Sequence, residues 1–202
     1  MSHTTSQGIN PKLDQESAAC YFGRASVQPL ASDAPHAPVK PPMILKGNQR
    51  GSGQQLATQL LNADNNQRVE ILDLRGSVAR DLHGAFEEWC ACSMATQCRK
   101  YLYSLSINPD PRQGDLTRAQ YFDLIERAEN EMGLSGQPRA VVFHIHNDGR
   151  EHYHVVWSRI DIEKFKAVQI SHDRLKLRRV AQEFARDHGL TLPPGMRNMK
   201  SE

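Results

Sequence analysis

The chain has 202 residues, of which 39% are hydrophobic and 24% are charged, and its formal net charge at pH 7 is +2. These values are typical of one soluble globular domain, and so small a net charge does not by itself indicate a nucleic-acid-binding protein. The sequence has no long apolar run and no secretory signal pattern, so we expect no membrane insertion and a cytoplasmic protein.

The two ends of the chain differ in composition from the middle. Residues 1–42 are rich in Pro, Ser, Ala and Gln and show little hydrophobic periodicity, which predicts a disordered leader. We expect the folded domain over residues 43–195 and a polar tail over residues 196–202.

Hydrophobic spacing in the first half of the folded part predicts two strands that alternate with two helices. The first strand is expected over 43–46 and ends at the glycine-rich segment 47–53. A second strand is expected over 68–74. The first helix carries Leu56, Leu60 and Leu61, and the second carries Val78, Leu82, Phe86, Trp89 and Cys90.

The second half begins with a strand predicted over 101–107. A helix then runs from Thr117, whose hydroxyl can form a capping box with Gln120, to Gly133, which suits a left-handed helix end. After a pair of strands, a final helix is expected. Its expected cap, apolar positions and end are Ser171, Leu175, Val180, Phe184 and Gly189.

Four of the nine histidines lie close together around that pair of strands: His144, His146, His152 and His154. The apolar runs 141–145 and 153–157 flank an Asp-Gly turn signal, which predicts a β-hairpin. Because successive side chains of a strand point to opposite faces, only a loop with an odd number of residues places all four histidines on one face.

We therefore expect a loop of three or five residues. A three-residue loop of Asp148, Gly149 and Arg150, with Gly149 in a left-handed conformation, pairs His146 with His152 and His144 with His154. The apolar side chains then form the other face of the hairpin: Phe143, Ile145, Tyr153, Val155 and Trp157. The fold predicted is α+β, an antiparallel sheet with helices packed on one face and a histidine metal site on the other.

Three imidazoles on one face are suited to a divalent metal, because neutral ring nitrogens are good ligands for Zn, Mn, Ni or Co. A set of three ligands leaves coordination positions open for a substrate oxygen, which favours catalysis over a structural role. The alternative is that the histidines are exposed on the strand and pair with carboxylates or water.

The hairpin segment resembles a known motif. His146-Asn147-Asp148-Gly149-Arg150-Glu151-His152-Tyr153-His154, with Arg159-Ile160-Asp161 after it, resembles motif III of the relaxase/mobilization nucleases of conjugative or mobilizable plasmids and integrative elements, which belong to the HUH endonuclease superfamily. Met43-Ile44-Leu45-Lys46 through Arg50-Gly51 is similar to the family's first motif, and Leu105-Ser106-Ile107-Asn108-Pro109 is similar to its strand-Ser-x-x-Pro segment. The resemblance covers residues 43–195.

The resemblance implies site-specific and strand-specific DNA nicking at a transfer origin. His146, His152 and His154 would hold the metal, with Mg or Mn preferred over Zn, Ni or Co, and Asp148 would orient the first histidine. The metal would polarise one phosphate of single-stranded DNA. Relaxosome accessory proteins and coupling proteins are the further partners implied.

One expected residue is missing from the resemblance. The family's nucleophile is a tyrosine shortly after the first motif, but no tyrosine lies between Met43 and Tyr101. Tyr101 and Tyr103 alternate with apolar residues on a strand and are expected in the core. Histidine nucleophiles in related enzymes would allow His83 or His144, and a metal-bound water would give simple hydrolysis. The nucleophile is therefore not assigned from the sequence.

Basic residues gather in two places, where we expect contacts with DNA phosphates. Lys46 and Arg50 lie in the first motif, and Arg174, Lys176, Arg178 and Arg179 lie on the final helix. The alternative for such a charge run is a solvated surface.

Two other functions compete with the nicking enzyme. Because the tyrosine is missing, the chain can be an inactive relaxase-like protein that binds DNA or acts as a mobilization accessory. A histidine-triad nucleotide hydrolase is disfavoured, because no third alternating histidine follows His154.

Overall fold

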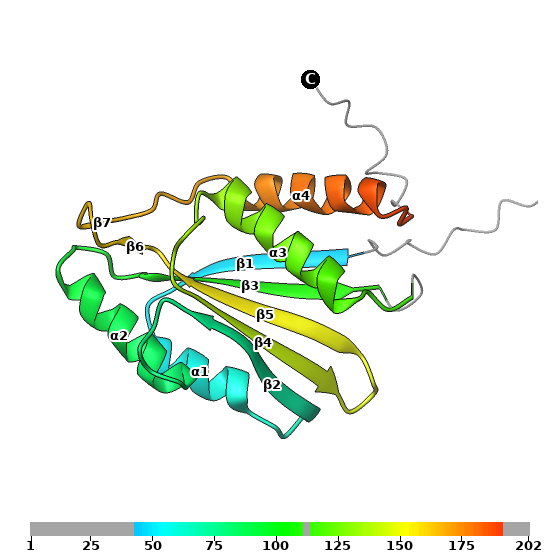
Figure 1. Cartoon of the computed structure of the whole chain (residues 1–202), viewed down its shortest axis with the longest axis horizontal. Helices are drawn as coiled ribbons and strands as arrows, with labels where there is room; N and C mark the ends of the chain where they lie inside the picture. The colour runs from blue at the N-terminus through cyan, green and yellow to red at the C-terminus, as the bar shows by residue number, and fades with distance from the viewer. Residues whose placement is uncertain (1–42, 111–113, 192–202) are drawn as a thin grey trace, which may run out of the picture. The chain divides into compact units, whose positions relative to one another are not determined.

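The computed structural model describes residues 43–110 and 114–191 (Figure 1). The predicted leader, 1–42, and the predicted tail, 196–202, lie outside the described residues, as do residues 192–195 at the end of the expected domain. Within the described ranges, no helix is long and apolar enough to cross a membrane.

Helices and strands occur in the predicted order, with one short ribbon added before the last helix. The described elements are β1 (Met43–Arg50), α1 (Gly53–Leu61), β2 (Asn66–Arg75), α2 (Leu82–Met94), β3 (Leu102–Pro109), α3 (Arg118–Met132), β4 (Arg139–His146), β5 (Glu151–Ser158), β6 (Ile160–Asp161), β7 (Lys166–Ala167) and α4 (Asp173–Asp187).

The main sheet has five strands in the order β1-β3-β5-β4-β2, and each neighbouring pair is antiparallel. The strands β6 and β7 form a separate antiparallel ribbon. This confirms the predicted α+β class with an antiparallel sheet. The hairpin strands β4 and β5 each have a neighbouring strand on both sides. The histidines therefore lie on inner strands of the sheet.

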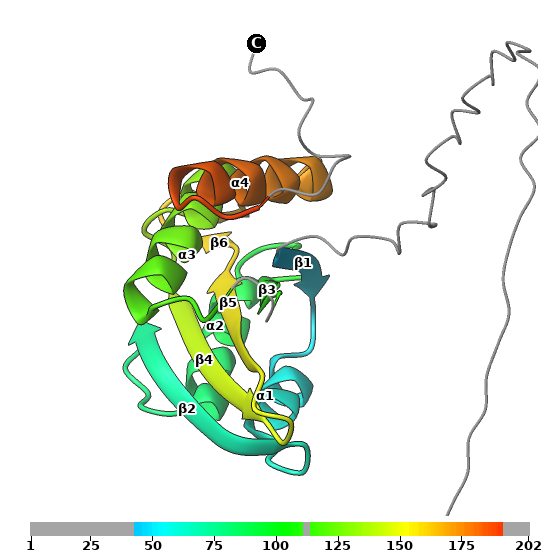
Figure 2. The ribbon, with the colours of Figure 1, turned by 90° about the vertical axis from the view of Figure 1, so that its right-hand side faces the viewer.

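Helices cover both faces of this sheet (Figures 1 and 2). α3 and α4 pack on the face that carries Phe143, Tyr153 and Trp157. α1 and α2 pack on the opposite face, against Val142 and Val156, and this is the face of the histidines. The histidine face is thus partly covered, whereas we had expected helices on the other face alone. The reason is that the strands are apolar on both faces in the half away from the hairpin turn, as in a sheet buried on both sides.

Two boundaries in the first half of the fold differ from the prediction by four residues, the end of β1 and the start of α2. β1 continues through Gly47 to Arg50. A Cβ at position 47 would lie 1.8 Å from the hydroxyl oxygen of Tyr103. The glycine therefore serves a close approach within the strand instead of a turn. α2 begins at Leu82, after Asp81, whose carboxylate accepts a hydrogen bond from the backbone N–H of Gly84 at 2.9 Å. Val78 lies before this cap and is 93% exposed.

The last two helices show where the prediction succeeded and failed. α3 has the predicted capping box between Thr117 and Gln120 and ends at Gly133, which has a φ of 70°. α4 is capped by His172 at a φ of 53°, not by Ser171. Leu175 is exposed, because the side of α4 that faces the core carries Leu177, Val180 and Phe184.

Candidate metal centre

The β4–β5 hairpin has a three-residue loop, as predicted in length. The N–H of His146 donates to the carbonyl oxygen of Arg150 at 2.9 Å, so the loop consists of Asn147, Asp148 and Gly149. Gly149 has the predicted left-handed conformation, with a φ of 80°.

The register of the hairpin is shifted from the one we expected. His144 lies opposite His152, and Val142 lies opposite His154. The expected pairs were His146 with His152 and His144 with His154. The shift is by two residues, and strand side chains repeat every two residues, so all four histidines stay on one face.

Three of these side chains converge. His144, His152 and His154 each offer one ring nitrogen, and the three nitrogens all lie within 4.8 Å of one another. His144 and His152 are buried, and His154 is partly buried. His146, which the sequence placed in the ligand set, stacks its ring on His152 at 4.2 Å between centroids. The structure thus offers His144 as the third ligand beside the predicted His152 and His154.

A backbone carbonyl fixes the protonation of His144. Its Nε2 lies 2.7 Å from the carbonyl oxygen of Leu60. A carbonyl oxygen can only accept, so Nε2 carries the proton and Nδ1 keeps its lone pair. This arrangement is the one in which metal-ligating histidines are commonly held.

The lone pair of His144 Nδ1 points toward His152. Nδ1 lies 3.3 Å from Nε2 of His152. Two nitrogens bound to one tetrahedral ion at about 2.1 Å are about 3.4 Å apart, so the observed separation suits two ligands of one cation. The other nitrogen of His152, Nδ1, is buried and has no hydrogen-bond partner among the described residues. An ion between the two rings would be held by Nε2 of His152, which leaves Nδ1 for a water. The donor set fits a divalent metal.

Burial keeps the three imidazoles neutral. It lowers the pKa of His152 to about 3, and the nearby His154, His146 and His144 lower that pKa further. Burial likewise lowers the pKa of His154 to about 4, and it also lowers the pKa of His144. At neutral pH the rings hold no charge of their own, so their lone pairs are available to a cation.

The covering helix ends at this cluster. α1 ends at Leu61, so the Leu60 carbonyl that holds His144 belongs to its last turn. The C-terminal end of a helix carries partial negative charge, which favours a cation nearby. α1 therefore orients the His144 ring and adds a field that favours a cation.

The comparison with known families agrees with this geometry. Residues 59–190 match the family described as "Relaxase: MobA/VirD2-like, nuclease domain". The chain belongs to this relaxase family. No curated protein matches the sequence.

Two solved structures of another relaxase domain are similar to this chain, and the first shows the same fold. Both are of the MobM relaxase domain and are described as bound to origin DNA of plasmid pMV158 and to Mn. The first is 13% identical over 79% of this chain and 94% of that chain, with a TM-score of 0.51. The second is 15% identical over 79% and 93%, with a TM-score of 0.48.

In this relaxase domain the side chain of Asp148 forms its hydrogen bonds with Arg150, next to the hairpin loop. Its carboxylate accepts a hydrogen bond from Nε of Arg150 at 2.7 Å. We had expected Asp148 to orient His146, but Nδ1 of His146 lies 3.2 Å from the carbonyl oxygen of Asn65. A backbone carbonyl thus stands beside this histidine, as Leu60 does beside His144.

The described tyrosines of the relaxase domain hold positions in the core. Tyr101 and Tyr103 are buried, as predicted, and the Tyr101 hydroxyl accepts from the N–H of Gly53 at 3.0 Å. Tyr121 and Tyr153 stack on each other on the face opposite the histidines. The remaining nucleophile candidate, His83, lies on α2 with Nδ1 2.6 Å from Oε1 of Gln54. In the part of the chain that the structure describes, His83 is not one of the three histidines that converge.

The predicted DNA-binding residues fall on two sides of the sheet. Lys46 and Arg50 are exposed on β1 and alternate with Gly47, which faces the α4 side, so they lie on the histidine face. Lys46 pairs with Ser106, which pairs with His154. Lys46 and His154 therefore lie in one row, about 10 Å apart at the backbone.

The basic residues of α4 lie on the other side. The helix packs on the face opposite the histidines. Lys176 donates to the carbonyl oxygen of Glu131 at 3.0 Å, and Arg179 forms an ion pair with the Glu131 side chain. Arg174 and Arg178 are exposed. These residues do not share a surface with the histidine cluster.

Proposed function

We propose that this relaxase domain is an HUH-type endonuclease that nicks one strand of DNA at a transfer origin, with Mg or Mn held by His144, His152 and His154. The observation that carries the proposal is the convergence of these three neutral imidazoles beside a basic sheet edge. The Mn and origin DNA in the MobM structures support it, since that domain shares the fold.

Each residue of the cluster has a part in holding the ion. His144 presents Nδ1 because Leu60 holds the proton on Nε2. His152 and His154 complete a three-nitrogen set that leaves positions for phosphate oxygens. When bound, the cation stabilises the negative charge that develops on the nonbridging oxygens during phosphodiester cleavage.

The sheet edge positions the strand. Lys46 and Arg50 stand on the histidine face of β1 and can bind phosphates beside the one that is cut. Single-stranded DNA would then cross β1 and β3 toward the cluster. DNA as substrate gives the cytoplasm as the proposed site of action, with relaxosome accessory and coupling proteins as further partners.

One observation favours a second function. The described tyrosines are packed in the core or on the opposite face, and the family's nucleophile is expected to face the metal. An inactive relaxase homologue that binds origin DNA, as a mobilization accessory, is therefore the second candidate.

Nicking assays separate the two candidates. Purified protein is incubated with MnCl2 or MgCl2 and with supercoiled or single-stranded origin DNA. The first function predicts nicked product that is lost in His152→Ala and kept in His172→Ala, which changes an exposed histidine on α4's N-terminal side. DNA binding without nicking across many origin sequences would support the second. Intact-mass analysis after the reaction identifies any residue that carries a nucleotide adduct.

A further inference from the structure

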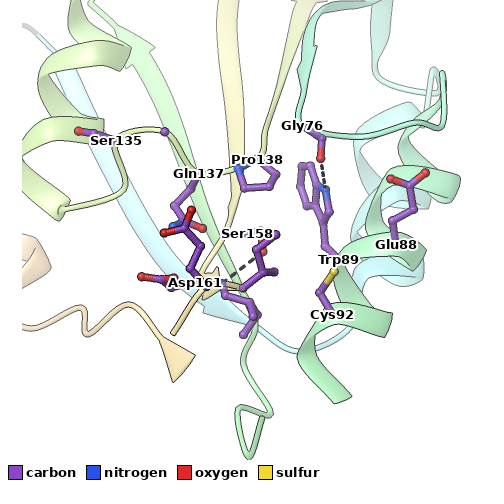
Figure 3. Close-up of a pocket in the computed structure, with 13 residues that line it drawn as sticks. Gly76, Glu88, Trp89, Cys92, Ser135, Gln137, Pro138, Ser158 and Asp161 are labelled. Atoms are coloured by element: carbon purple, nitrogen blue, oxygen red, sulfur yellow. Dashed lines mark hydrogen bonds between the residues drawn. The ribbon is translucent and has the colours of Figure 1, made fainter. Parts of the chain in front are cut away.

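A cavity of about 470 Å³ lies at the end of the sheet away from the histidines. It is lined by Trp89 and Cys92 of α2, by the loop before β4 that includes Pro138, and by Ser158 and Ile162 of the β5–β6 segment (Figure 3). Pro138 precedes the start of β4, whereas the histidines lie at its far end. Strands rise about 3.4 Å per residue, so Pro138 and His144 are separated by roughly 20 Å along β4.

The charged side chains of this cavity are acidic. Glu88, Asp161 and Glu163 line it, and its 13 lining residues include no lysine or arginine. Glu88 is fixed in place, since it accepts from the Ser77 hydroxyl and the Ala79 N–H, each at 2.7 Å. Lys164 pairs with Asp161, and its charge also interacts with that of Glu163, which is exposed. Such a lining attracts a cationic group and repels DNA phosphates.

The turn between β6 and β7 adds apolar surface beside the cavity. Ile162 is 61% exposed and Phe165 is 67% exposed, on the same short turn. Phe165 has a φ of 48°, a conformation that costs a residue other than glycine about 1 kcal/mol or more. The turn thus presents two large apolar side chains to solvent in a strained conformation, and such exposed groups gather at sites of protein association.

We propose that this cavity and the β6–β7 turn together bind a segment of a partner protein that carries a basic side chain next to a large apolar one. The basic group pairs with Glu163 and Glu88, and the apolar group packs on Ile162. The volume lies within the range of about 300–1,000 Å³ that is common for ligand pockets. The surface is at the opposite end of the sheet from the histidines, so a partner and DNA can be bound together.

Labelled peptides test this surface on the full chain. Three short peptides are compared by fluorescence anisotropy: one basic and apolar, one acidic and apolar, and one basic with serine in place of the apolar residues. We expect saturable binding of the first alone. We expect that binding to weaken about tenfold or more in Glu163→Lys and in Ile162→Ser, both on the exposed turn. Glu87→Lys makes the same charge change at an exposed position of α2 outside the cavity and should bind as the wild type does.

Several results would overturn the proposal. These are no saturable binding of the basic and apolar peptide, equal binding of the acidic peptide, or unchanged binding in both turn variants. Self-association of the chain that Glu163→Lys abolishes would assign the surface to a second copy instead. Displacement of the peptide by one with the sequence of residues 192–202 would assign it to the chain's own end. Metal and DNA binding should be unchanged in Glu163→Lys, so a failure here is distinct from a failure of the histidine site.

Discussion

Replacing Glu129 with alanine is expected to destabilise the fold, because this carboxylate joins α3 to three strands. One oxygen accepts from Arg139 at 2.8 Å and from the Trp157 indole N–H at 3.0 Å. The other accepts from Arg75 at 2.7 Å. Glu129 and Arg139 are both buried, so the substitution leaves a buried cation with a lost partner.

The size of the effect follows from the partners left behind. Removing one member of a buried ion pair costs about 3–5 kcal/mol. Arg139 keeps its ion pair with Asp73, at 2.7 Å. The cost of losing Glu129 should therefore lie near the lower end of that range. The Trp157 N–H left without an acceptor adds about 1–3 kcal/mol, but losses that share one carboxylate do not sum in full. We expect about 3–5 kcal/mol in total, a large part of the roughly 5–15 kcal/mol that stabilises such a domain.

Urea unfolding at pH 7, followed by circular dichroism, measures this loss. Glu126→Ala removes an exposed carboxylate from the same helix and should change the free energy of unfolding by less than about 0.5 kcal/mol. A loss below about 1 kcal/mol in Glu129→Ala would refute the reasoning.

The same carboxylate gives a pH dependence. Burial acts to raise the pKa of Glu129, but hydrogen bonds from Trp157 and Arg75 and the charges of Arg139 and Arg75 hold it below its usual 4.5. A depressed pKa stabilises the fold above pH 4.5, and this stabilisation is lost as the pH falls through the folded-state pKa. The difference between wild type and Glu129→Gln should therefore be largest at pH 7 and should narrow below pH 4.5. A difference that grows with acidity would contradict the sign.

Three further outcomes are expected. Mn at about 100 times its dissociation constant should raise the melting temperature of the wild type and of His172→Ala by about 5–10 °C. The melting temperature of His152→Ala should stay unchanged. Equal shifts in all three proteins would count against the site. Lys46→Ala should weaken binding to single-stranded DNA and reduce the salt slope by about 0.7, while Mn binding stays the same; an unaltered slope would remove Lys46 from the DNA surface. Gly47→Ala should cost about 1–3 kcal/mol in a urea titration, because its Cβ would meet the Tyr103 hydroxyl; a neutral result would mean that Tyr103 moves freely.

The sequence predicted the face of the histidines better than their pairing. An odd loop is enough to place all four on one side, and that parity follows from strand geometry. The register was wrong by two residues, because the Asp-Gly signal suits a turn at either position. The faces were unaffected, since a shift of two preserves parity.

The convergence of His144 with His152 and His154 could not be predicted from the sequence. His144 is oriented by the carbonyl of Leu60, which lies 84 positions earlier in the chain. A backbone carbonyl leaves no residue signature, so the motif alone could not separate His144 from His146. The cavity was missed for a similar reason, because α2, the loop before β4 and the β5–β6 segment meet only in the folded chain.

Helix faces were predicted well where local signals were strong. The capping box at Thr117 fixed the start of α3. On α4, Leu175 was assigned to the core, but the stripe that packs on the sheet begins at Leu177. Apolar spacing did not separate the two, because packing against β1 selects the buried side.

The central claim is that His144, His152 and His154 bind one divalent cation, and anomalous X-ray scattering at the Mn edge tests it most directly. Crystals of the protein grown with MnCl2 should show an anomalous peak within bonding distance of all three imidazoles. A peak bonded to none of them, or no peak on the histidine face, would contradict the account.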